Sequence, residues 1–394
     1  MKILAIHNSY QQPGGEDQVF LAETSLLERY GHQVVRYSKH NDRAAGMNRL
    51  ALAGTALWNN STYRDLRVLI RRERPDVAHF HNTFPLVSPA GYYAAKAEGV
   101  PVVQTLHNYR LLCPNALFFR DGGVCEDCMG KAITWPGVVH KCYRGSRAAS
   151  GLVTAMLATH RALRTWTDMV DVYIALTEFA RRKFIEGGLP EERMTVKPNF
   201  VDPDPGPGTS DDGHALFVGR LSPEKGVDTL LAAWERLRGR VPLKIVGDGP
   251  LKGQVVAAAD RHPWVVYLGH KRAEEVHELM KDASVLIFPS GWYETFGRVA
   301  AEAFATATPV IAADIGAIAE LVEHGRVGLR FRPGDSEDLA AQVDWFLFHP
   351  EVHARMRRQA RAEFEARYTA ERNYRMLVAI YASALKGEQT QQQA

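Results

Sequence analysis

Two acidic and two basic residues in the second half of the chain have types and spacing that suit a phosphorylated sugar. Glu294 and Glu302 are separated by seven residues, in a segment that follows an apolar run and continues as a helix. Arg220 and Lys225 flank a turn in the segment VGRLSPEKG. A guanidinium and an ammonium on one loop can bind a diphosphate, and carboxylates can accept hydrogen bonds from sugar hydroxyls. The alternative for this loop is a solvated basic turn without a ligand.

The residues between the two glutamates predict the start of a helix at the site. Thr295, Phe296 and Gly297 lie at this helix N-terminus, where unpaired N–H groups and the helix dipole favour a phosphate or a hydroxyl. Glu302 lies about two turns further on, among alanines, which predicts a buried, partnered acid in place of an ordinary exposed carboxylate.

Glycines follow two further strands of the second half. Gly247 lies in VGDGP and Gly269 in LGH. Small residues let backbone amides approach a phosphate, although a tight turn from strand to helix is the simpler interpretation of Gly247. The next glycine, Gly253, comes one residue too late for GxGxxG, which counts against a nicotinamide enzyme.

Short apolar runs alternate with amphipathic stretches along the chain, which predicts two doubly wound α/β domains with parallel sheets that face each other across a cleft. The proline- and glycine-rich segment 201–214 predicts a linker, so the N-terminal domain is expected over 1–198 and the C-terminal domain over 199–370. The irregular stretch 107–145 is interpreted as an insertion in the N-terminal domain.

Composition excludes some classes of protein. The chain has 394 residues, enough for two domains, and a net charge of +3, which argues against a dedicated nucleic-acid binder. Apolar runs are far shorter than the ~20 residues of a membrane span. A cytoplasmic protein is the resulting expectation, with any membrane contact peripheral at the inner face.

Four cysteines, Cys113, Cys125, Cys128 and Cys142, gather in the insertion. Clustered cysteines in a cytoplasmic chain favour a metal over disulfides, so they predict a structural zinc site. Free thiols packed in a loop, or redox-active pairs, are the alternatives.

A predicted helix over 146–165 carries apolar residues at helical spacing, with arginines around them. A basic amphipathic helix can contact an anionic membrane. A helix packed in the core with solvated arginines is the other interpretation.

The motif E-x7-E at Glu294 and Glu302, with GRLSPEKG, GDGP and TPVIA in order, resembles the retaining GT-B glycosyltransferases of family 4. The resemblance covers essentially the whole chain and is strongest over 215–334. It implies a GT-B architecture, with a last helix, 371–385, that packs back on the N-terminal domain.

The resemblance also implies roles for the residues above. Arg220 and Lys225 would hold the donor diphosphate, Glu294 the transferred sugar and Glu302 the ribose. The backbone amides of 295–297 would contact sugar and phosphate, and Gly269 would line the base pocket. No catalytic metal or protein nucleophile is implied.

In the first half, His107 matches the position of a family histidine that contacts the transferred sugar. Gly14 and Gly15, in QQPGGED, match glycines that lie under the donor phosphates or near the acceptor. A satisfied loop histidine and a plain turn before a helix are the respective alternatives.

The predicted activity is transfer of a sugar from a nucleoside diphosphate sugar to a glycan, lipid-linked or small-molecule acceptor, in surface polysaccharide or glycoconjugate synthesis. Two rival hypotheses are a sugar-nucleotide epimerase of the same architecture and a non-catalytic sugar-nucleotide-binding subunit.

Overall fold

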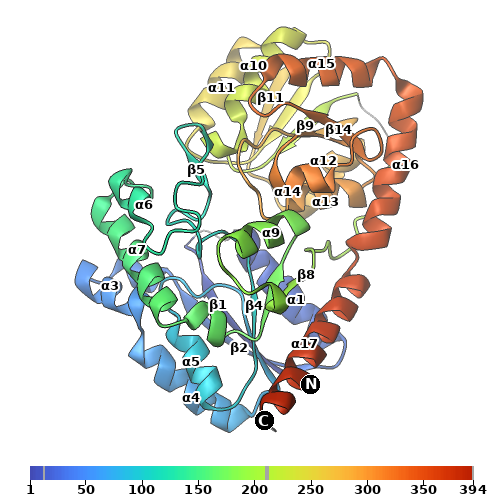
Figure 1. Ribbon diagram of the computed structural model, residues 1–394. Coiled ribbons are helices and arrows are strands. Elements are labelled where there is room, and N and C mark those ends of the chain that lie inside the picture. Colours follow the sequence, from blue (N-terminus) through green and yellow to red (C-terminus); the bar gives the residue numbers. More distant parts are fainter. Residues whose placement is uncertain (12–13, 209–212, 393–394) are drawn as a thin grey trace. The chain divides into compact units, whose positions relative to one another are not determined.

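A computed structural model describes residues 1–11, 14–208 and 213–392. The chain divides into two compact units. Unit 1 comprises Met1–Leu117, Glu126–Pro198 and Glu371–Ala394, and unit 2 comprises Phe118–Cys125 and Asn199–Ala370. Each unit is built on one parallel sheet with helices on both faces (Figure 1).

The sheet of unit 1 has the order β2-β1-β3-β4-β7-β8, and all its strands are parallel. The central strands are buried on both faces, as expected where helices cover a parallel sheet. The strand bounds are β1 Lys2–Ser9, β2 Gln33–His40, β3 Val77–Phe80, β4 Val102–Thr105, β7 Val172–Ala175 and β8 Met194–Val196.

The helices of unit 1 include several in the stretch 42–73, where the sequence analysis defined no element. Asn59 caps one of them by accepting hydrogen bonds from the amides of Ser61 and Thr62. The helix bounds are α1 Gly15–Arg29, α2 Asp42–Ala45, α3 Arg49–Leu57, α4 Asn60–Glu73, α5 Ala90–Ala97, α6 Trp135–Val139, α7 Arg147–Ala162, α8 Thr165–Asp168, α9 Glu178–Glu186 and the 3-10 turn η1 Glu191–Arg193.

The last helix, α17 (Ala370–Gln392), packs on the sheet of unit 1, although it follows unit 2 in the sequence. Leu377, Ile380 and Tyr381 join a cluster with Ile3 of β1 and Ile174 of β7. The helix runs past the expected end at residue 385, and residues 393–394 lie outside the described part.

A short hairpin in the insertion differs from the prediction. Its strands are β5 (Phe119–Arg120) and β6 (Gly123–Val124). The whole insertion was expected in the N-terminal domain, but residues 118–125 belong to unit 2. The reason is packing, because the buried Phe118 ring lies edge-on to the ring of Tyr293, with 6.3 Å between centroids.

The sheet of unit 2 has the order β11-β10-β9-β12-β13-β14 and is also parallel. Its strands are β9 Ala215–Val218, β10 Leu243–Val246, β11 Val265–Gly269, β12 Val285–Phe288, β13 Val310–Ala313 and β14 Gly328–Phe331. Its helices are η2 Pro223–Lys225, α10 Val227–Leu237, α11 Lys252–Arg261, α12 Ala273–Asp282, α13 Arg298–Ala305, α14 Gly316–Leu321, α15 Ser336–Leu347 and α16 Pro350–Arg367.

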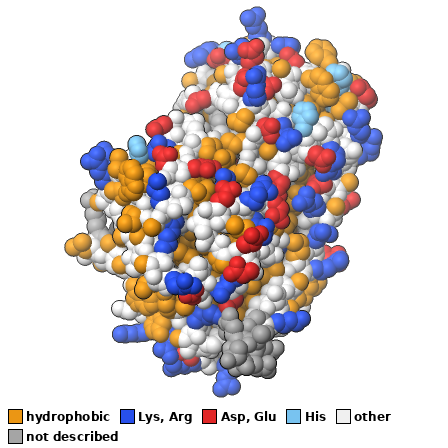
Figure 2. All heavy atoms as spheres, in the orientation of Figure 1, with side chains coloured by type: hydrophobic (Ala, Val, Ile, Leu, Met, Phe, Trp, Pro, Cys, Tyr) orange, Lys and Arg blue, Asp and Glu red, His pale blue; other side chains and the backbone are white. Residues whose placement is uncertain are grey.

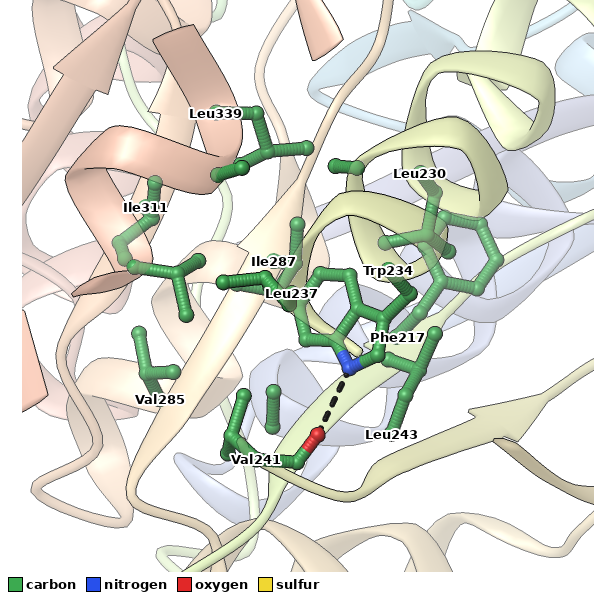
Figure 3. Packing of buried hydrophobic residues seen from close by; sticks show 14 of the residues in the cluster. Phe217, Leu230, Trp234, Leu237, Val241, Leu243, Val285, Ile287, Ile311 and Leu339 are labelled. Carbon is green, nitrogen blue, oxygen red and sulfur yellow. Dashed lines mark hydrogen bonds between the residues drawn. The ribbon is translucent and has the colours of Figure 1, made fainter. Parts of the chain in front are cut away.

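The core of unit 2 forms between the sheet and helices α10 and α15 (Figure 3). Trp234 of α10 is fully buried among Phe217, Leu230 and Leu243, and its indole N–H donates to the carbonyl of Val241 at 3.0 Å. Burying the indole with its one donor satisfied stabilises this layer without a desolvation penalty.

The predicted linker is held against unit 2 over part of its length. Asp204 accepts two hydrogen bonds from Arg361 of α16, at 2.8 and 2.7 Å, and the amide of Gly208 donates to the carbonyl of Thr306. Residues 209–212 lie outside the described part. The part of the linker before residue 209 is therefore bound to unit 2 by an ion pair and a backbone hydrogen bond. Its content of prolines and aspartates does not predict these contacts.

None of the helices in the described part of the chain is both long and apolar enough to cross a membrane.

Candidate active site

The loops that follow β9 and β10 in unit 2 pack directly on each other. Gly247, with φ of 145°, is positioned so that an added Cβ would lie 1.8 Å from the carbonyl oxygen of Gly219. Its amide donates to the carbonyl of Gly269 at 2.9 Å. Gly247 is therefore required by close approach of three loops at the carboxyl edge of the sheet.

The loop after β9 also contacts the loop after β12. Gly226 has φ of 72°, and a Cβ there would lie 1.9 Å from the carbonyl oxygen of Pro289. The amide of Gly291 donates to the carbonyl of Glu224 at 2.9 Å. This approach brings Lys225, at the end of η2, to the segment that carries Glu294.

Three donors converge on one oxygen of Glu294. Lys225 Nζ, Ser290 Oγ and Trp292 Nε1 lie 2.5, 3.0 and 3.0 Å from Glu294 Oε1. Lys225 Nζ also lies 5.3 Å from the ring centroid of Trp292, within the range of a cation–π contact. Because Glu294 is buried, these contacts hold its carboxylate in one orientation beside a cation.

The helix that follows, α13, begins after Gly297. Phe296 is buried and its ring meets that of Tyr368 at 5.7 Å, so the turn before the helix is fixed by packing. Thr295 is half-buried at this turn. The first amides of an α-helix have no partner within the helix, and such amides can bind an anion or a hydroxyl.

Glu302 lies one turn beyond Arg298 on α13 and pairs with it, with 3.0 Å between Arg298 Nε and Glu302 Oε1. Glu302 is buried, as its alanine neighbours predict. Arg220 is exposed after β9, and its carbonyl accepts from the amide of Ser222 at 3.0 Å.

In unit 1, His107 is buried just beyond the end of β4. Its Nε2 lies 3.0 Å from Nδ1 of His81. Burial, with repulsion from His7 and Lys197, lowers the pKa of His107 to about 3. His107 is therefore a neutral imidazole at physiological pH and can accept or donate a hydrogen bond.

A buried carboxylate lies near the other ring nitrogen of His81, with 3.6 Å between His81 Nε2 and Glu23 Oε2. One of the two imidazoles donates to the other across the 3.0 Å contact, so the tautomers of His81 and His107 are coupled.

Further charges and hydroxyls complete this network. Glu23 pairs with Lys197, and both side chains are fully buried. His79 lies 2.8 Å from the hydroxyls of Tyr381 and Thr105, one on each ring nitrogen. Burial lowers the pKa values of His79 and His81 well below the ordinary histidine value. The helix α17 thus contributes to the polar core beneath His107.

Among the described residues, one group of three metal-ligating side chains has its ligand atoms within 4.8 Å of one another. This group consists of Glu23, His79 and His81. The ammonium of Lys197 already neutralises Glu23, and both nitrogens of His79 face hydroxyls. We interpret the group as a hydrogen-bonded core network and not as a metal site.

The predicted zinc ligands are not gathered in this way. All four cysteines are described and none is in a disulfide, but no three of their sulfurs form a group within 4.8 Å. Cys113 donates to Asn115 Oδ1 at 2.9 Å, and Cys128 lies 3.8 Å from the carbonyl of Thr134. Cys125 belongs to unit 2, and the other three cysteines belong to unit 1. The zinc site therefore stays a prediction.

Gly14 caps α1, and its amide donates to Asp17 Oδ2 at 2.8 Å. Asp17 in turn lies 2.9 Å from His7 Nε2. A Cβ on Gly15 would meet no atom within 4 Å, so packing among the described residues does not require a glycine there. The other part of the predicted motif, residues 12–13, lies outside the described residues.

A pocket of unit 1 opens beside His107. Its polar lining includes Asn82, Gln104, Asn108 and Arg110. Arg110 contacts the rings of Phe84 and Tyr143, with its guanidinium carbon 4.9 Å from each centroid. The pocket therefore offers hydrogen-bonding groups on a fixed scaffold.

Two sequence families match adjoining parts of the chain. Glycosyltransferase Family 4 matches residues 13–205, and Glycosyl transferases group 1 matches residues 205–363. A GDP-mannose-dependent alpha-mannosyltransferase from Mycobacterium tuberculosis is 32% identical over 292 residues, which cover 73% of this chain and 68% of that protein. The chain belongs to the group 1 glycosyltransferases of family 4.

Other relatives match more narrowly or show the fold alone. A glycogen synthase from Mycobacterium tuberculosis is 34% identical over 183 residues. These residues cover 45% of this chain and 44% of that protein, so the chain spans less than half the length of this relative. The crystal structure of HepE from Anabaena in complex with UDP has a TM-score of 0.70 at 20% identity, and covers 97% of this chain and 100% of that one. This likeness confirms the predicted GT-B fold of two Rossmann-like domains.

In this member of the family, three residues at the site were not found from the sequence. Ser290 and Trp292 orient Glu294, and Arg298 pairs with Glu302. The spacing of Arg298 and Glu302, one helical turn apart, is a signal that could have revealed that pair. The indole of Trp292 lies two residues from Glu294, but adjacency alone does not predict which atom it contacts.

Proposed function

We propose that the protein is a retaining glycosyltransferase that moves a sugar from a nucleoside diphosphate sugar to a glycan, lipid-linked or small-molecule acceptor. The synthesis of a surface polysaccharide or glycoconjugate is the process that we assign to it. The observation that carries the proposal is the convergence of Lys225, Ser290 and Trp292 on Glu294 at the start of α13, in a chain of this family.

The donor diphosphate is expected to lie at the helix start. Lys225 pairs with Glu294 just before this helix, and exposed Arg220 lies on the same loop as Lys225. When the diphosphate binds, Lys225 shares its charge between the phosphate and Glu294. Two cations and a helix N-terminus can stabilise the leaving diphosphate, so the mechanism calls for no catalytic metal.

The sugar and the ribose are expected to bind the two glutamates. Glu294, held by three donors on one oxygen, can accept hydrogen bonds from sugar hydroxyls through its carboxylate. Glu302 is the candidate for the ribose diol, and its ion pair with Arg298 orients the carboxylate. Attack by the acceptor on the face that the diphosphate leaves would retain the configuration without a protein nucleophile.

Acceptor binding is assigned to unit 1. His107, a neutral imidazole, can form a hydrogen bond with a hydroxyl of the transferred sugar or the acceptor. The adjoining pocket supplies Asn108 and Arg110. Among the described residues, no atom beyond its chain neighbours lies within 4 Å of a Cβ placed on Gly15, and the N-terminus of α1 is therefore a candidate ligand site.

A donor screen tests the proposal. The thermal unfolding of the chain is measured with UDP-, GDP-, ADP- and dTDP-sugars, because a ligand that binds the folded state raises its apparent stability. The structural neighbour HepE is in complex with UDP, so UDP-sugars come first. One class of donor should raise the melting temperature, and Lys225→Ala should abolish that rise.

The matched control is Lys252→Ala, an exposed lysine of α11 in the same unit, which should retain the full response. If no donor stabilises the wild-type chain, or both variants respond equally, the proposed donor site is wrong. The transferred product, analysed for anomeric configuration, separates a retaining transferase from an epimerase, which would return an altered donor.

A further inference from the structure

Unit 1 exposes a group of large apolar side chains on and before the short helix α6. Ile133, Trp135 and Val139 are 57%, 56% and 51% exposed. Trp135 and Val139 are four residues apart on α6 and therefore lie on one face. Figure 2 shows hydrophobic side chains beside basic ones over the part of the molecule that contains α6 and α7.

The opposite face of α6 is packed inside the unit. Pro136 and Gly137 are buried, and a Cβ on Gly137 would lie 2.7 Å from the side chain of Pro114. The amide of Cys142 donates back to the carbonyl of Gly137 at 2.9 Å. The helix is therefore held with its apolar side chains outward.

The neighbouring helix α7, where the sequence analysis placed the membrane contact, presents its apolar side chains to the interior. Val153, Met156 and Leu157 are buried, and buried His160 bonds to the carbonyl of Leu57 at 2.9 Å. This burial favours the interpretation of α7 as a core helix. An apolar membrane contact must use other residues.

The stretch of chain that contains α6 and α7 carries charge of one sign. Residues 129–167 contain six lysines and arginines and neither aspartate nor glutamate. Two of these cations have structural partners, because Arg161 donates to the carbonyls of Lys131 and Leu111, and Arg164 pairs with Asp168. The other four are exposed and have no acidic partner among the described residues: Lys131, Lys141, Arg144 and Arg147.

We propose that this surface, formed by Ile133, Trp135, Val139 and the four exposed cations and here called the α6 surface, binds an anionic lipid bilayer. Indole rings favour the boundary between headgroups and acyl chains, and flanking cations attract anionic headgroups. A two-fold contact with a second copy would place like charges against each other, which disfavours self-association.

The inference is independent of the donor site. Every residue of the α6 surface lies in unit 1, and none is among the residues assigned to the nucleoside diphosphate sugar. Membrane binding places the enzyme where a lipid-linked acceptor would be found. A vesicle assay without any sugar nucleotide therefore fails or succeeds separately from the proposed transfer reaction.

The test is flotation of the full chain with two kinds of vesicle. One contains phosphatidylcholine and phosphatidylglycerol, and the other phosphatidylcholine alone. The protein should float with the anionic vesicles, and high salt should release it. The double variant Lys141→Glu/Arg144→Glu should bind at least about 25-fold more weakly, from about fivefold for each lost cation.

Two further variants make the test specific. Trp135→Ser/Val139→Ser keeps the charge and should weaken binding, while the melting temperature stays unchanged because both side chains are exposed. Arg355→Glu/Arg358→Glu is the matched control, with two exposed arginines three residues apart on α16 of unit 2, and should bind like wild type.

Several outcomes would overturn the proposal. These are no flotation of the wild-type chain with anionic vesicles, equal binding to neutral vesicles, or equal weakening by the control on α16. A dimer in solution that Trp135→Ser dissociates would assign the surface to a second copy. Failure to bind vesicles, with capture of an acidic protein that Lys141→Glu/Arg144→Glu abolishes, would assign it to a protein partner.

Discussion

Substitution of Lys197 by methionine tests the buried network beneath His107. Lys197 and Glu23 are 0% and 1% exposed, and their side chains form an ion pair across 174 residues of sequence. Lys197→Met keeps a side chain of similar length but removes the cation. Glu23 would then be a buried carboxylate that faces the neutral imidazole of His81 at 3.6 Å.

The expected cost follows from this burial. Breaking a buried ion pair by removing one partner typically costs about 3–5 kcal/mol, because the remaining charge is left uncompensated. For a domain of this size about 1 kcal/mol lowers the melting temperature by roughly 2–4 °C, so the unfolding of unit 1 should shift down by roughly 10 °C. The double variant Glu23→Gln/Lys197→Met removes both charges and should recover most of this loss.

The assay is calorimetric unfolding of the wild-type chain, both single variants and the double variant. Lys183→Met is the control, since Lys183 pairs with Glu126 and the more exposed Glu186, and exposed pairs contribute about 1 kcal/mol or less. The reasoning is refuted if Lys197→Met shifts unfolding no more than the control does. It is equally refuted if the double variant loses the sum of the two single losses.

Four other predictions address the site and the insertion. Glu294→Ala should abolish sugar transfer while the melting temperature stays near that of wild type, and full activity in a transfer assay would refute the proposed site. Trp292→Phe removes an N–H donor to a carboxylate, so kcat/KM should fall by about tenfold or more, and an unchanged value would contradict its orienting role. Unit 1 should lose stability as the pH falls below about 6.5, which is the pKa of a histidine in the unfolded chain. The reason is that burial holds the pKa of His107 at about 3 and the pKa values of His79 and His81 well below the ordinary value. The unfolded state then binds more protons than the folded one, at up to about 1.4 kcal/mol per pH unit for each histidine, and unfolding temperatures that do not change from pH 7 to 5 would contradict this. Elemental analysis should find one zinc per chain if the four cysteines bind the metal, whereas no zinc and four thiols that titrate freely would exclude the site.

The elements of the second half were predictable from the sequence because their signals are local. The apolar run 215–218 and the amphipathic stretch 227–237 coincide with β9 and α10. Alternation of such runs with helices requires a parallel sheet, since each strand must return by a crossover. The stretch 42–73 was less predictable, because short helices capped by asparagine carry a weaker periodic signal.

The candidate site was predictable in its residue types but not in its contacts. The spacing of Glu294 and Glu302 and the two cations on the loop after β9 identified the donor loops. The sequence did not predict that Lys225 would contact Glu294, 69 residues away, or that an indole would share the same oxygen. Such contacts depend on which strands are neighbours in the sheet, and β9 lies directly beside β12.

The sequence by itself therefore determined the fold class, the family and the loops that carry the charged residues, because periodicity and motif spacing are properties of neighbouring residues. Only the tertiary structure decided three further features. It paired Glu23 with Lys197, it brought Tyr381 of the last helix to His79, and it placed the hairpin 118–125 with unit 2. The physical reason is that burial and pairing of distant side chains depend on the packing of whole elements, which local sequence does not encode.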